Sequence, residues 1–288
     1  MSMLEKKEIR ITLRLLTRNP LSIAGGIITV WFFSTAIAIS LTGSRFLPHD
    51  PDAIMLSNAL SPPSMTYWFG TDPLGRDIFS RVMMATPIDA SIAVVIVGVS
   101  LVVGVMLGSM AGYVGSKLDE IIMRTTDVFM AFPALVLALA VAVGLGPGII
   151  PLVEALLIVW WPWYVRLARG ETLSVRENQY IEGARAAGLS TFRIVTKHVI
   201  PNLITPVLVY ASLDLGYVIL TTSVLSYLGL GAQPPQSEWG RMVFDGQPYL
   251  STAWWVPILP GVMILIVVLG FSLLGDGLRD VLDPKSRK

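Results

Sequence analysis

The chain has 288 residues, of which 53% are hydrophobic and 14% are charged, and its formal net charge is +1. Soluble domains carry about a quarter charged residues, so this composition excludes an ordinary soluble protein and favours a membrane protein. The absence of cysteine excludes disulfides, zinc–thiolate sites and a cysteine nucleophile.

The first elements in chain order are two apolar segments separated by a longer, more polar stretch. A membrane-spanning helix needs about 20 consecutive apolar residues. We expect the first at 21–41 and the second at 90–113, with an external segment at 42–89 between them. The basic stretch KKEIRITLRLLTRNP at 6–20 is similar to the start of a signal peptide. Because the apolar segment is too long for one and more spans follow, we interpret it as an uncleaved anchor.

The next apolar stretch, 128–165, contains one charged residue, Glu154. The sequence GLGPG at 144–148, followed by Pro151, interrupts it, and glycine and proline favour turns. We therefore expect a hairpin of two spans. The last two spans are expected at 203–224, which Asp214 interrupts, and at 252–274. The predicted fold class is an all-α membrane protein with six transmembrane helices.

The basic residues predict the orientation of these helices. If the N-terminus is cytoplasmic, the only lysines and arginines in the outer segments are Arg45, Arg76, Arg81 and Arg241, out of 21. Because basic residues accumulate on the cytoplasmic side, we expect both termini inside. The chain then divides into a cytoplasmic segment (1–20), the first transmembrane helix (21–41), the external segment (42–89), a five-helix core (90–275) with a cytoplasmic loop (166–202), and a cytoplasmic tail (276–288).

The cytoplasmic loop contains the segment YIEGARAAGLSTFRIVTKHVIPN, 180–202, which is far less apolar than its surroundings. Good helix formers predict a helix from about 173 to 187, and Gly188 suits the position after a helix end, where the backbone turns with positive φ. Ser190 can cap a second helix, and Pro201 marks a change of direction before the fifth span. We expect a helix, a glycine turn and a second helix.

The surface of this segment has two interpretations that the residues alone leave open. One is a knob that fits a groove of a partner protein, because small side chains allow close approach. The other is an amphipathic helix on the lipid headgroups, for which Arg193 and Lys197 are suited. The small residues are Gly183, Ala184, Ala186 and Ala187, and the charged residues beside them are Glu182 and Arg185.

The external stretch TDPLGRD at 71–77 is foremost a turn, because Asp-Pro and the following Gly75 favour one. Arg76 stands between Asp72 and Asp77, so an external lock made by this arginine is the functional alternative to the structural interpretation.

Glu154 and Asp214 are acidic residues inside expected spans, and a charge within a membrane is a candidate functional residue. Glu154 lies near the outer end of its span, where it can reach water. Asp214 lies near the middle of the fifth span, where we expect it to face an aqueous pathway or a neighbouring helix. We expect a residue solvated within a cavity; proton coupling is the alternative. His49 and His198 lack metal-ligand spacing. We therefore expect no metal bound by this chain. Because no stretch matches a phosphate-binding loop, we also expect no cofactor.

The segment at 180–202 resembles the EAA signature of ABC-importer permeases, which is an E-A-A triplet, a glycine six positions after the glutamate, and an Ile-x-Leu-Pro end. The corresponding residues here are Glu182-Gly183-Ala184, Gly188 and His198-Val199-Ile200-Pro201, with Gly183, His198 and Ile200 replacing the usual residues. The resemblance implies a coupling helix that docks into a cleft on a separate ATPase subunit. The residues it assigns to this contact are Glu182, Gly183, Ala184, Arg185, Ala186, Ala187, Gly188, Leu189, Ser190 and Pro201.

Five blocks spread over nearly the whole chain resemble one branch of that family, the dipeptide/oligopeptide/nickel permeases. They are RNPLSIAGG (18–26), FGTDPLGRDIFSR (69–81), LDEIIMRTTDVFMAFP (118–133), LSYLGLGAQPPQSEWGRM (225–242) and GDGLRDVLDP (275–284). The branch usually continues the second block with Gly-Ala-Arg-x-Ser. This chain has Ala85-Thr86-Pro87-Ile88-Asp89 instead, so a proline replaces an external arginine.

The resemblance implies a type I ABC-importer permease fold in the plasma membrane of a prokaryote, the inner membrane where there are two. The implied partners are a second homologous permease, two ATPase subunits that bind ATP and Mg, an external substrate-binding protein and the lipid bilayer, with no nucleic acid. The chain itself would be a non-catalytic transport subunit. Di- or oligopeptides rank first as its solute, and nickel or oligosaccharides are alternatives.

Two other classes of protein remain open from the sequence. An ion-coupled secondary transporter would use Asp214 and Glu154, but such folds usually contain internal repeats with paired broken helices, and the segment at 180–202 has no second copy. An intramembrane enzyme would need a nucleophile and a base, or metal ligands, that converge within the spans. Two isolated histidines do not supply them.

Overall fold

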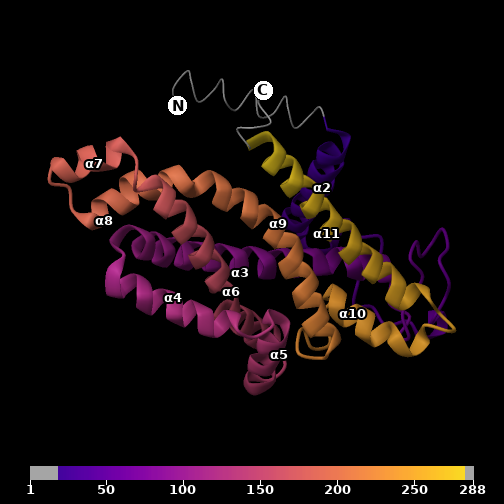
Figure 1. Cartoon of the computed structure of the whole chain (residues 1–288). Coiled ribbons are helices and arrows are strands. Elements are labelled where there is room, and N and C mark those ends of the chain that lie inside the picture. The colour runs from indigo at the N-terminus through magenta and orange to yellow at the C-terminus, as the bar shows by residue number, and fades with distance from the viewer. Residues whose placement is uncertain (1–18, 283–288) are drawn as a thin grey trace.

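In the computed structural model, which describes residues 19–282, the chain folds into a bundle of helices of very different lengths (Figure 1). Residues 1–18 and 283–288 lie outside this range, so the expectations for the two cytoplasmic ends largely stay predictions. The described helices are α2 (Pro20–Thr42), α3 (Ile78–Val114), α4 (Ser116–Met130), α5 (Ala134–Leu145), α6 (Ile149–Val175), α7 (Gln179–Ala186), α8 (Thr191–Ile194), α9 (Ile200–Tyr227), α10 (Trp239–Gly246) and α11 (Trp255–Leu282).

Short helical turns complete the described chain. A π-helical turn, Val195–Val199, joins α8 to α9. Turns of 3-10 helix lie at Gly43–Phe46, Leu56–Asn58 and Gln247–Tyr249.

Five of the six expected spans correspond to helical segments that are long and apolar enough to cross a membrane. The third is different, because α4 and α5 meet at a bend of 84° and α5 has only 12 residues. Helix α4 begins at Ser116, before the uncharged stretch that starts at 128. The bend falls before Pro133, and proline drives the preceding residue out of the helical conformation. The expected turn at 144–148 is confirmed between α5 and α6.

Three glycines of α3, at intervals of four residues, show how α3 packs against α6. A Cβ at Gly104 would overlap Tyr164, a Cβ at Gly108 would overlap the Val165 carbonyl oxygen, and a Cβ at Gly112 would lie 2.9 Å from the carbonyl oxygen of Arg169. The glycines therefore let the two backbones approach closely.

Because the residue numbers of the two helices rise together along this contact, α3 and α6 run in parallel. The chain must then return from the end of α3 to the opposite side of the membrane before α6 begins. Counting the bent pair α4–α5 as one span that makes this crossing gives the expected count of six.

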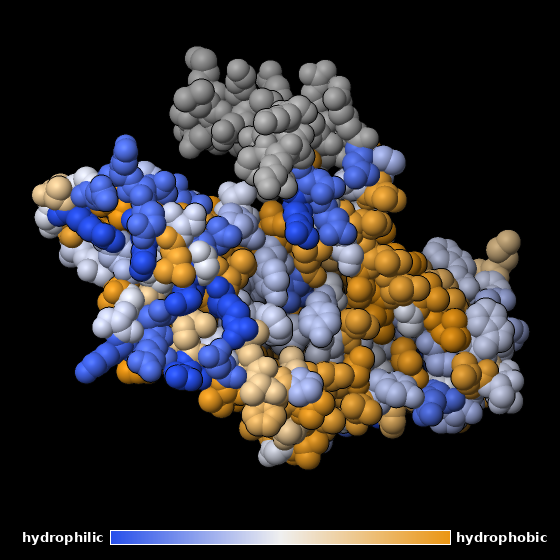
Figure 2. Space-filling view, viewed as in Figure 1, coloured by the Kyte–Doolittle hydropathy of each residue, from blue (hydrophilic) through white to orange (hydrophobic). Residues whose placement is uncertain are grey.

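The first span belongs to the bundle, because α2 packs along α11. A Cβ at Gly25 would lie 2.5 Å from the Leu274 nitrogen, and Phe32 of α2 is fully buried with its ring centroid 5.8 Å from that of Phe271. The outer face of α2 remains apolar and exposed, and Figure 2 shows apolar surface along α2 and α11 next to a hydrophilic end over α7 and α8. Exposed apolar residues of α2 include Leu21, Ile27, Val30, Ile37 and Leu41.

Helix α3 has 37 residues and is therefore about 55 Å long. Because the hydrocarbon core is about 30 Å thick, the first turns of α3, before its uncharged segment at 90–114, project beyond the outer surface. The expected external segment at 42–89 thus ends in a helix. Asp77 caps that helix by accepting hydrogen bonds from the Ser80 backbone nitrogen (3.1 Å) and hydroxyl (2.5 Å).

Candidate functional site

The conspicuous feature of the cytoplasmic end is a helical hairpin, α7–α8, which projects beyond the ends of α3 and α6 (Figure 1). Helix α7 ends before Gly188, which has a φ of +76°, as predicted for a residue after a helix end. Ser190 occupies the N-cap position of α8, without a side-chain capping hydrogen bond. The expected helix, glycine turn and second helix are therefore present.

Two expectations about the helix boundaries are wrong. The helix expected from 173 to 187 is interrupted, because α6 ends at Val175 and α7 begins at Gln179. Pro201 does not mark a break, since the segment Thr191–Tyr227 is a continuous helix. Pro201 lies in the helix just after the π-helical turn Val195–Val199.

The hairpin has one buried face and one exposed face. Ile181, Ala184, Ile194 and Val195 are buried and hold the two helices together. A Cβ at Gly183 or at Gly188 would meet nothing within 4 Å. The residues that form the exposed face, together called the knob, are Glu182, Gly183, Ala186, Ala187, Gly188 and Ser190, all exposed.

The knob is tied to α3 through Arg185. Its Nε donates a hydrogen bond to the Tyr113 hydroxyl at 2.9 Å, and its guanidinium carbon lies 4.9 Å from the centroid of the Tyr113 ring. Leu189 closes the turn, because its nitrogen donates to the Ala184 carbonyl at 3.2 Å. Of the residues assigned to the ATPase contact, Ala184 is buried within the hairpin, the exposed Arg185 binds α3, and Pro201 is separate from the knob.

Further arginines join the cytoplasmic ends of α3, α4 and α6. Arg169 forms a two-pronged pair with Asp119, with nitrogen–oxygen distances of 2.5 and 2.6 Å. Arg176 donates to the Gly112 carbonyl at 3.0 Å, and the more exposed pair Arg166–Asp127 measures 2.6 Å.

We call Arg169, Asp119, Arg176, Arg185 and Tyr113 the clasp. Sequence reasoning counted these arginines as orientation signals and did not find their partners, which are 50 to 72 residues away in the chain. The signal in the sequence that could have revealed these partners is the group of acidic residues in α4, which lie opposite the basic end of α6.

At the outer end, TDPLGRD forms the expected turn. The Asp72 carboxylate accepts hydrogen bonds from the backbone nitrogens of Leu74 (2.8 Å) and Arg76 (3.0 Å), and pairs with the Arg76 side chain at 2.6 Å. Gly75 has a φ of +75° and packs on the Met55 carbonyl, where no side chain fits. Arg76 pairs with Asp72, and Asp77 caps α3; the external lock stays a prediction.

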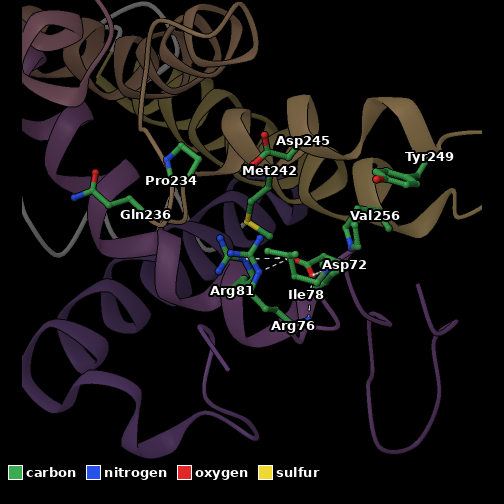
Figure 3. Close-up of a pocket in the computed structure, with 12 residues that line it drawn as sticks. Asp72, Arg76, Ile78, Arg81, Pro234, Gln236, Met242, Asp245, Tyr249 and Val256 are labelled. Carbon is green, nitrogen blue, oxygen red and sulfur yellow. Dashed lines mark hydrogen bonds and ion pairs between the residues drawn. The ribbon is translucent and has the colours of Figure 1, made fainter. Parts of the chain in front are cut away.

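Arg81 is the residue on which the external segments converge. Its guanidinium donates to the Pro51 carbonyl and the Asp52 carboxylate, each at 3.0 Å, and to the Pro235 carbonyl at 3.4 Å. Figure 3 shows Arg81 and Arg76 directed at Asp72, in a cavity of about 250 Å³ between the external segment, α10 and the beginning of α11. Because these charges are paired within the chain, the cavity presents no unpaired charge to a solute.

Asp214 is buried between α9 and α6, with 6% of its surface exposed. Its Oδ2 accepts hydrogen bonds from the Trp160 indole nitrogen (2.8 Å) and the Tyr164 hydroxyl (2.7 Å). Of the two environments expected for it, the neighbouring helix is the one observed, and the residue is not solvated. Glu154, by contrast, is exposed on the second turn of α6, next to Ser91 in a cavity of about 180 Å³.

The chain matches the family model described as "binding-protein-dependent transport system inner membrane component" over residues 104–288. It is 40% identical over 272 residues to a probable D,D-dipeptide transport system permease of Escherichia coli, covering 94% of this chain and 90% of the relative. It is 41% identical to a dipeptide transport system permease of Alkalihalophilus pseudofirmus (94% and 88%) and 38% identical to an oligopeptide transport system permease of Bacillus subtilis (94% and 87%).

The fold is similar to a chain of the MetNI methionine ABC transporter in an inward-facing conformation. The TM-score is 0.50 at 21% identity, and the alignment covers 67% of this chain and 94% of the other.

Proposed function

This chain belongs to the family of binding-protein-dependent transport system inner membrane components, and we propose that it is a permease subunit of an ATP-driven importer of di- or oligopeptides, forming half of the translocation pathway. The fold and the membrane location are those of the family.

The observation that carries the proposal is the knob. It is a projection whose exposed face includes small residues of glycine, alanine and serine beside two charged residues, Glu182 and Arg185. Arg193 and Lys197, which suit lipid headgroups, are exposed on the following helical turns. The small residues of the knob itself allow another backbone to approach closely, which favours a groove. We infer that this face docks into a cleft of a separate ATPase subunit.

The clasp gives the knob a mechanical connection to the membrane helices. Because Arg185 and Arg176 bind the cytoplasmic end of α3, and Arg169 binds α4, a displacement of the knob is transmitted to three helices together. We infer that closure of two ATPase subunits around ATP and Mg rocks this chain and a second homologous permease between outward- and inward-facing states, as a rigid-body motion. An external binding protein would deliver the solute.

The substrate class rests on the relatives, several of which are described as transporting dipeptides or oligopeptides. Nickel complexes and oligosaccharides remain alternatives. The ion-coupled alternative has less support, because the Asp214 carboxylate is held by two donors of α6.

The coupling proposal is tested by reconstituting the complete complex and comparing wild type with Glu182→Arg and Gly183→Trp. Gly183 is the better site for added bulk than Gly188, since it lies in a helix with open space around it and has no positive φ. We expect both variants to retain assembly of the permease pair but to lose binding-protein-stimulated ATP hydrolysis and uptake of a labelled dipeptide.

Gly170→Trp is the matched control, because Gly170 is an equally open glycine on α6, outside the knob. We expect it to behave as wild type. If the two knob variants also hydrolyse ATP and transport like wild type, the knob is not the coupling surface. Competition by unlabelled peptides, nickel complexes or oligosaccharides identifies the substrate class in the same assay.

A further inference from the structure

Two carboxyl groups lie buried against each other at the outer end of the bundle. Asp89 belongs to the projecting part of α3, and Glu238 is the residue before α10. Their exposed fractions are 3% and 1%, and their side chains are hydrogen-bonded to each other. Asp89 stands in the stretch where the sequence departs from the usual pattern, at the position that the pattern gives to serine.

The remaining hydrogen bonds distinguish the two carboxyl groups. Glu238 caps α10, accepting from the backbone nitrogens of Gly240 (2.9 Å) and Arg241 (2.8 Å). Asp89 accepts only a longer bond, from the Trp239 nitrogen at 3.4 Å. Because backbone donors favour the ionised form of a carboxyl group, Glu238 is the carboxylate of the pair. Asp89 is then the acid that holds the proton and donates it.

The charged side chains on the surrounding elements form ion pairs with each other. On α10, Arg241 pairs with Asp245 at 2.9 Å. On α3, Arg81 pairs with Asp52 at 3.0 Å. The residues that α9 presents to α10 here, such as Ser223 and Ser226, are uncharged. Among the described residues, Glu238 is the charged group that acts on Asp89.

Helix α10 is therefore held to α3 by a contact that requires one proton. Two carboxylates at hydrogen-bonding distance in a buried site cannot both be ionised without strong repulsion. Trp239 strengthens the same contact, because its indole nitrogen donates to the Val82 carbonyl at 2.9 Å. Since α10 connects α9 to α11, its release would free the outer ends of both helices to move.

We propose that Asp89 and Glu238 form a single-proton latch, which holds α10 against α3 on the outer side of the membrane and releases it when the proton is lost. The sign of the pH dependence follows from the proton that Asp89 holds: once it is lost, two buried carboxylates face each other and repel. The packed state therefore binds this proton more tightly than the released state. The latch is thus complete at low pH and is lost as the pH rises through the pKa of the packed pair.

The latch is tested by thiol labelling, because the chain has no cysteine of its own. Met242→Cys places a thiol on α10 at a position that is 8% exposed, and Met65→Cys places one on the external segment at a position that is 96% exposed. A membrane-impermeant maleimide is added from outside to the complete complex in its membrane. The labelling rate at 242 is divided by the labelling rate at 65. Because both rates depend on the ionisation of a thiol, this ratio cancels the pH dependence of the thiol itself.

We expect this ratio to rise about tenfold across the pH range of a titration, from its acidic to its alkaline end, as the shared proton is lost. In an Asp89→Asn background the ratio should stay low across that range, because the amide donates to Glu238 and has no proton to lose. Glu238→Gln removes the second charge and should also abolish the rise. It serves as an independent variant should Asp89→Asn not accumulate.

A wild-type ratio that is independent of pH, or an equal rise in Asp89→Asn and Glu238→Gln, would overturn the latch. The assay requires no transport, so its outcome is separate from that of the coupling experiment. Labelling of Met65→Cys from outside also verifies the orientation on which the external position of the latch rests.

Discussion

Asp214 shows how a single charged side chain can serve packing within a membrane protein. Its carboxylate satisfies two buried donors, the Trp160 indole and the Tyr164 hydroxyl, which would otherwise lack acceptors in a nonpolar environment. The same residue is the strongest candidate for ion coupling that the sequence offers. Ion coupling requires a group that can ionise at this position, whereas packing requires only a hydrogen-bond acceptor.

We expect Asp214→Asn to transport at a rate close to wild type, because the amide oxygen remains an acceptor. Asp214→Leu should lower the free energy of unfolding by about 1–3 kcal/mol for each donor left without an acceptor. Thermal unfolding of the purified complex and uptake by proteoliposomes measure the two effects. A stable Asp214→Asn protein that no longer transports would instead indicate a titrating role.

Among the elements, the contact between α3 and α6 determines the architecture. The glycines at 104, 108 and 112 place the α6 backbone directly on α3, and the parallel direction of the two helices forces the chain to cross the membrane between them. The bent pair α4–α5 makes that crossing. The same contact aligns the cytoplasmic ends of the helices, so that Arg169 reaches Asp119 and Arg176 reaches Gly112.

We expect Gly108→Leu to separate α3 from α6, because its side chain would overlap Val165 and Ala168. Overpacking of this kind costs about 1–3 kcal/mol or more. Gly98→Leu is the matched control on the same helix, since a Cβ there meets nothing within 4 Å. Yield and thermal unfolding of the two variants provide the comparison. Equal loss of stability would show that the glycines do not mediate the contact.

At the scale of the whole molecule, six crossings place the knob and the external segment on opposite sides of the membrane. The apolar surface between them faces lipid or a partner chain, and the charged side chains gather at the ends (Figure 2). This separation is what an importer subunit requires, because its solute arrives on one side and its ATPase acts on the other.

We expect the topology to be verified by single cysteines in the cysteine-free chain. Pro147→Cys, in the turn between α5 and α6, should react with an impermeant maleimide added from outside. Gly183→Cys in the knob should react only after the membrane is permeabilised. Protection of Pro147→Cys from outside reagent together with reaction from inside would show that α4–α5 does not cross and would contradict the count of six.

The sequence by itself determined the membrane class, the approximate positions of most spans and the hairpin at Gly188, and it predicts the orientation of the spans. These features depend on local hydropathy, on the placement of charge and on turn chemistry, which neighbouring residues encode. The family resemblance followed from motifs of the same local kind and is confirmed.

Only the tertiary structure decided which groups meet. The bend before Pro133, the break after Val175, the clasp around Arg169, and the burial of Asp89 against Glu238 were all absent from the sequence reasoning. The contacts of Arg169 and of Asp89 join residues 50 to 150 positions apart. Their partners are selected by helix packing, and no local pattern records which helices will become neighbours.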